Sequence, residues 1–80
     1  MNYFIISFQV IIDSKQIEHG LIGSVSSNND YQPNTVKRTV TEQYRKKFPE
    51  AIGVAVRIIE VRSVTHEDYI KATPNFIQLI

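Results

Sequence analysis

The sequence has no cysteine among its 80 residues, so disulfide bonds and thiolate chemistry are excluded. Its three glycines are scattered and form no phosphate-binding loop. An excess of charge of one sign is also lacking, because nine Lys and Arg residues against eight Asp and Glu residues leave a net charge of +1. This balance gives no bulk electrostatic signal for nucleic acid or for an anionic membrane.

No long hydrophobic run is present either. The apolar stretch near the N-terminus covers about ten residues, too few for a transmembrane helix. It has no positively charged region before it and no small-residue cleavage site, which argues against a signal peptide. We therefore expect a cytoplasmic protein that forms a single α+β domain over residues 1–80. A domain this small buries a thin core, and such domains often gain stability by associating.

The first strong pattern is a strict alternation over residues 3–12, which predicts a β-strand because successive side chains of a strand point to opposite faces. One face is wholly apolar and consists of Phe4, Ile6, Phe8, Val10 and Ile12. The other is mixed and consists of Tyr3, Ile5, Ser7, Gln9 and Ile11. A polar turn at residues 13–15 and a second alternating run over residues 17–26 predict a β-hairpin.

A helix is predicted over residues 35–48, capped by Asn34 or Thr35 and ended by Pro49. Its apolar side chains recur every four residues and form a stripe that can pack on a sheet; they are Val36, Val40, Tyr44 and Phe48. A third strand runs from Gly53 to about Val64, and its apolar alternation changes phase at Ile58 and Ile59. Either a β-bulge keeps all its apolar residues on the core face or the strand is buried on both sides.

After the third strand, Thr65 and Asp68 resemble a capping box that starts a short helical turn before Thr73 and Pro74. The predicted fold is a small three-stranded, mostly antiparallel sheet in the order 2-1-3, with β-β-α-β connectivity. The long helix covers the Phe4 face, and a short helix and an apolar tail follow at the C-terminus.

The reverse face of the first strand then needs a cover. It is expected from the C-terminal tail or from a second copy of the chain, and a homodimer is favoured. The residues predicted to form this dimer or partner face are Tyr3, Ile5, Ile11, Phe76, Ile77 and Leu79.

The alternative interface is the basic helix, where Arg38, Arg45 and Lys46 would contact the phosphates of a nucleic acid. Glu42 lies four residues from Arg38 and from Lys46, so it can pair with either and lower the charge of that face. No aromatic side chain accompanies the basic residues for base stacking. A solvated helix face is therefore the favoured interpretation.

No arrangement of residues indicates catalysis, a metal or a cofactor. His19 and His66 are the only histidines, and the neighbours of His66 on one turn point in different directions. Glu18 and Glu60 are expected on opposite edge strands, about 9–10 Å apart, so cross-strand or solvent-facing carboxylates explain them more simply than an acid–base pair. The order of elements is loosely similar to that of many small bacterial and phage proteins. We thus expect a non-catalytic accessory or inhibitor protein from such a source, with nucleic-acid binding by helix 35–48 as the alternative.

Overall fold

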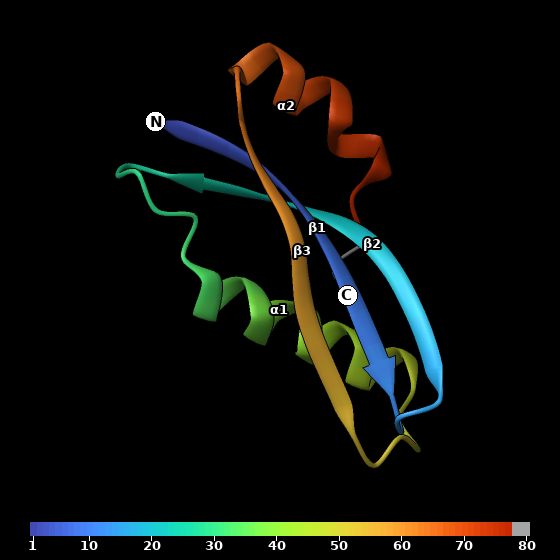
Figure 1. Ribbon diagram of the computed structural model, residues 1–80. Helices are drawn as coiled ribbons and strands as arrows, with labels where there is room; N and C mark the ends of the chain where they lie inside the picture. The colour runs from blue at the N-terminus through green and yellow to red at the C-terminus, as the bar shows by residue number, and fades with distance from the viewer. Residues whose placement is uncertain (78–80) are drawn as a thin grey trace.

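The computed structural model describes residues 1–77, which form a three-stranded sheet with a helix on each side (Figure 1). The elements in chain order are β1 (Asn2–Ile12), β2 (Gln16–Ser26), α1 (Pro33–Lys47), β3 (Val54–Val64), α2 (His66–Ala72) and a 3-10 turn (Thr73–Asn75). Both pairings are antiparallel and the strand order is β2-β1-β3. The predicted fold class and strand order are confirmed.

The hydrophobic core lies between the sheet and α1. The apolar face of β1 is buried there, with Ile6 and Val10 fully inaccessible and Phe8 nearly so. The α1 residues Val36, Val40 and Tyr44 pack against it. Ile22 of β2 also joins this core, because it lies opposite Ile6 in the register.

The start of α1 differs from the prediction. The helix begins at Pro33, and the residue before it, Gln32, adopts a left-handed conformation with φ 58° and caps no backbone N–H through its side chain. Asn34 and Thr35 are therefore inside the first turn. Proline is well suited to the first helical position because its missing N–H would be unpaired there in any case. That preference prevailed over the side-chain caps.

A β-bulge in β3 decides between the two interpretations of its change of phase. Ser7 pairs with Glu60 and Phe8 pairs with Ile58, so Ile59 is an extra residue without a partner in β1. The residues on either side keep their apolar side chains toward the core; these are Val54, Val56, Ile58 and Val61. Ile59 itself is 57 % exposed. The bulge thus retains four of the five apolar residues on the core face and turns the fifth toward solvent.

The hairpin turn between β1 and β2 is fixed by Asp13. Asp13 and Ser14 both have positive φ, at 52° and 58°, as a tight hairpin turn requires. The Asp13 carboxylate accepts hydrogen bonds from the backbone N–H groups of Ile52 and Gly53, each at 2.8 Å. These bonds tie the turn to the loop that leads into β3.

The C-terminal segment returns to the reverse face of the sheet. The Thr65 hydroxyl accepts a hydrogen bond from the Asp68 N–H at 3.1 Å, which confirms the predicted cap, but α2 extends to Ala72 and is longer than the expected single turn. Beyond the 3-10 turn, Phe76 forms an isolated parallel bridge with Leu21, and the Ile77 N–H donates to the Leu21 carbonyl at 2.9 Å. The chain therefore adds a short strand-like segment to the outer edge of β2.

Candidate interaction site

We call the half of the reverse face around Tyr3 and Ile5 its upper half. This half is covered by α2 and by Phe76. Ile5 is only 4 % exposed, and Tyr3 packs its ring against His66 and Tyr69 at centroid distances of 5.0 and 5.3 Å. Tyr69 in turn meets the ring of Phe76 edge-on at 5.4 Å. Burial raises the pKa of the Tyr69 phenol, and the neighbouring Tyr3 raises it further. Of the two covers considered for this face, the tail and a second copy of the chain, the tail is observed to pack there through Phe76.

The remaining residues of the predicted partner face do not lie together. Ile77 packs against the core from the edge of β2, on the other side of the sheet from Phe76. Ile11 is half-buried at the opposite end of β1 from Tyr3, beyond the reach of α2. Leu79 lies outside the described residues. The structure thus brings Tyr3, Ile5 and Phe76 together and leaves Ile11 apart from them.

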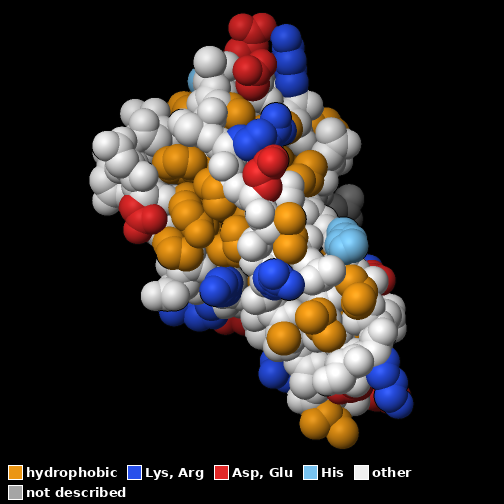
Figure 2. Space-filling view, viewed as in Figure 1, with side chains coloured by type: hydrophobic (Ala, Val, Ile, Leu, Met, Phe, Trp, Pro, Cys, Tyr) orange, Lys and Arg blue, Asp and Glu red, His pale blue; other side chains and the backbone are white. Residues whose placement is uncertain are grey.

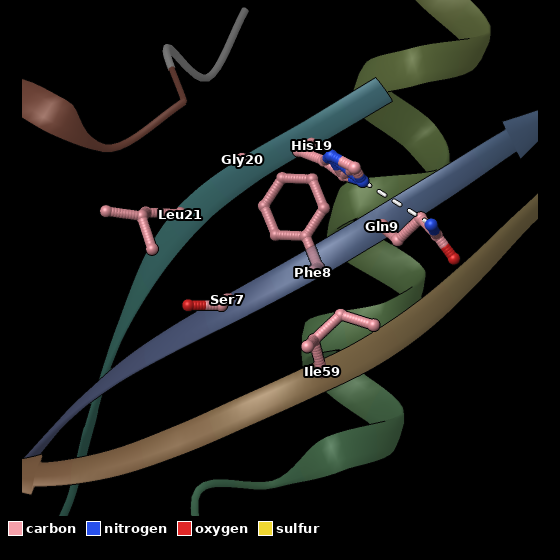
Figure 3. A pocket seen from close by; sticks show the side chains of 7 residues that line it. All are labelled: Ser7, Phe8, Gln9, His19, Gly20, Leu21 and Ile59. Atoms are coloured by element: carbon pink, nitrogen blue, oxygen red, sulfur yellow. Dashed lines mark hydrogen bonds between the residues drawn. The ribbon is translucent and has the colours of Figure 1, made fainter. Parts of the chain in front are cut away.

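The lower half of the reverse face has no covering element among residues 1–77. Ile17 and Ile59 are 55 % and 57 % exposed there. Beside Ile59 lies a shallow, mostly apolar hollow of about 580 Å³, lined by Ser7, Phe8, Gln9, His19, Gly20, Leu21 and Ile59. Figure 3 shows that these side chains come from three neighbouring strands, with the Phe8 ring beside Gly20. The single polar contact inside it that the structure describes joins Gln9 and His19 at 3.4 Å.

The outer edge of β3 is a second open surface. No strand within the described chain pairs with this side of β3, whereas Phe76 and Ile77 occupy part of the outer edge of β2. Lys or Arg and Asp or Glu side chains stand along β3 between hydrophobic areas in Figure 2. Glu60 and Arg62 are 61 % exposed each and approach one another to 3.6 Å.

Sequence reasoning did not identify this edge as a site. It placed the third strand at an edge but assigned contacts only to the reverse face and the basic helix. The signal was present in the alternation of Arg57, Glu60 and Arg62 with apolar residues. It was obscured because the bulge changes which side chains share a face.

The basic helix presents its predicted contacts to solvent. Arg38, Arg45 and Lys46 are all exposed on α1. Lys47 instead reaches across to β2, where its ammonium group pairs with Glu18 at 3.3 Å and lies 5.5 Å from the ring centroid of Tyr44. Burial raises the pKa of the Tyr44 phenol, although Lys47 acts in the opposite direction. Nucleic-acid contacts by this helix stay a prediction.

The other candidate groups do not converge. Glu18 lies opposite Val10 on the α1 side of the sheet, whereas Glu60 lies opposite Ser7 on the reverse side. The two carboxylates thus point to different faces. Within residues 1–77 no three His, Asp or Glu side chains gather at a position that could hold a metal ion.

Comparison with protein-family models, with curated proteins and with solved structures finds no match to this chain. None of the helices in residues 1–77 has the length and apolar character needed to cross a membrane.

Proposed function

We propose that this chain is a non-catalytic interaction protein that works as a homodimer, joined through the outer edge of β3. In this proposal the protein acts as an accessory or inhibitory factor by binding and not by chemistry. The observation that carries the proposal is the unpaired edge of an 11-residue strand. Such an edge presents a row of backbone N–H and C=O groups that another strand can pair with.

The composition of β3 favours pairing over protection. Proteins often block edge strands with proline or lysine, and β3 contains neither. Its bulge at Ile59 is one protective feature, but the charged side chains are of both signs, so they do not simply repel a second strand. The edge is therefore suited to a partner with complementary charges.

Apolar side chains of the core are also partly exposed along the β3 edge. Val56, Ile58 and Val61 pack against the core yet remain only partly buried. A second β3 would remove part of this apolar surface from water, which is worth about 25 cal/mol for each Å². For a domain of 80 residues with a thin core, that gain matters.

The test compares three isoleucines of similar exposure. Ile59→Asp places a charge on β3, whereas the matched controls Ile17→Asp on β2 and Ile70→Asp on α2 change residues that are 55 % and 53 % exposed elsewhere. Light scattering after size-exclusion chromatography gives the mass of each variant at micromolar concentration. We expect the unmodified chain and both controls to have twice the 9.2 kDa chain mass, and Ile59→Asp to shift toward the monomer.

A monomer at every concentration of the unmodified chain would overturn the proposal. Dissociation by Ile17→Asp would overturn it as well, with or without dissociation by Ile59→Asp, because it would place the contact on the open half of the reverse face. Circular dichroism of each variant shows whether a loss of association comes from unfolding.

A further inference from the structure

We infer that two copies pair antiparallel, β3 to β3, about a two-fold axis at Val61, so that Glu60 of each copy faces Arg62 of the other. This inference rests on the proposed homodimer and adds its register and the residues that select the partner. The partner is a second copy of this chain because the charge pattern of β3 is complementary to itself when the strand is reversed.

The sheet register puts the three residues in the required positions. Glu60 and Arg62 pair with Ser7 and Ile5 of β1, so both side chains lie on the reverse face. Val61 lies between them and pairs with Ile6, so its side chain lies on the α1 side. A two-fold axis at residue 61 places residue 60 of one strand opposite residue 62 of the other, and does so twice.

Neighbouring registers are less favourable. An axis moved by one residue to Glu60 or to Arg62 would set two identical charges directly opposite one another, and like charges in that position destabilise a strand pair. With the axis at Val61, two opposite-charge pairs form on one face and the two Val61 side chains meet on the other. The sequence around the axis therefore favours this register.

The bulge gives the contact a natural limit. Past Glu60, the extra residue Ile59 breaks the alternation, and Ile58 and Ile59 together would lie opposite Ser63 of the second copy. The resulting assembly is a six-stranded sheet with β3 at its centre and β2 at both ends. Because each copy uses the same edge, the contact closes as a dimer and does not propagate into a fibre.

Reversing single charges tests the register. Glu60→Arg leaves a chain with positive charges at both positions, and Arg62→Glu leaves one with negative charges at both. Each variant alone replaces two attractive contacts with two repulsive ones, so we expect its dimer dissociation constant to rise at least about tenfold. Sedimentation velocity across a dilution series measures this change.

Mixing the two variants provides the decisive experiment. The positive chain and the negative chain then meet with opposite charges at both positions, so we expect a heterodimer in a one-to-one mixture of two proteins that are each largely monomeric. Restored association cannot come from repair within a chain, because each chain still carries like charges at positions 60 and 62. Circular dichroism melting of each variant controls for folding, and an exposed pair of this kind contributes little to stability.

Three outcomes would overturn the inference. One is unchanged dimerisation of both single variants, and another is an effect of Glu60→Arg without an effect of Arg62→Glu. The third is a mixture that stays monomeric although both chains are folded. If the unmodified chain is a dimer in these cases, the homodimer survives and only the register is wrong; a monomeric unmodified chain would refute both.

Discussion

At the scale of single residues, Gly23 allows α2 and the tail to lie against the sheet. A Cβ at this position would clash with the Phe76 ring and with the Tyr69 hydroxyl group. Gly23 lies opposite Ile5 in the register, so the two rings cover a side chain for which the sequence analysis expected a cover from the tail or from a second copy. The glycine that weakens β2 locally is thus a condition for burying the reverse face.

The first stability prediction follows from this close approach. Gly23→Ala forces two packed rings to move, and we expect the free energy of unfolding to fall by about 1–3 kcal/mol. Gly53→Ala is the matched control, because the nearest atom to its added Cβ lies 4.0 Å away, and we expect a change within about 0.5 kcal/mol. Urea denaturation followed by circular dichroism measures both; equal losses would show that α2 does not pack as described.

Tyr69 also predicts a pH dependence. Burial favours its neutral phenol, so its pKa in the folded chain lies above the ordinary value of 10.0. The unfolded chain therefore loses this proton first. The contribution of the Tyr69 phenol to the free energy of unfolding is fully present below about pH 10 and is lost as the pH rises further. Tyr44 is shifted in the same direction, so it contributes to the same loss.

The variant Tyr69→Phe isolates this contribution. It removes the ionisable group but keeps the ring, so we expect a smaller loss of unfolding free energy between about pH 8 and about pH 11 than in the unmodified chain. Tyr44→Phe should reduce the loss independently. Urea denaturation at the two pH values is the measurement, and an unchanged loss in Tyr69→Phe would contradict the burial of this phenol.

At the scale of elements, the strands were predictable where the pattern was regular. The alternation of β1 identified the core face, and the spacing of Val36, Val40 and Tyr44 identified the face of α1 that covers it. The strand order followed because the most apolar strand belongs in the middle. Thr65 marked the start of α2 because its hydroxyl group can accept a hydrogen bond from a free backbone N–H of the first helical turn.

The failures arose where two local preferences compete or where a contact is distant in sequence. Helix α1 begins at Pro33 although Asn34 and Thr35 are residue types that often cap helices. The ring of proline fixes φ at a helical value, which favours Pro33 as the first helical residue. The bulge at Ile59 was one of two alternatives, since the phase change alone does not say whether a second layer covers the strand. The β3 edge was missed because Arg57 joins Glu60 and Arg62 on one face only as a result of that bulge.

At the scale of the whole molecule, the two faces of the sheet differ in how they are closed. Helix α1 closes one face, while α2 and Phe76 close only the upper half of the other. The sheet edges differ as well, since β2 is partly occupied by the tail and β3 is free within residues 1–77. A dimer through β3 removes the longer open edge and leaves the hollow beside His19 accessible.

Amide hydrogen exchange at increasing protein concentration tests this account most directly. In the monomer the outward N–H groups of β3 face water, whereas in the dimer they donate to the second strand. We therefore predict that exchange slows with concentration around Val61, within residues 58–64, and stays unchanged in residues 16–21 of β2. Concentration-dependent protection in residues 16–21 with none in β3, or no protection at any concentration, would contradict the central claim.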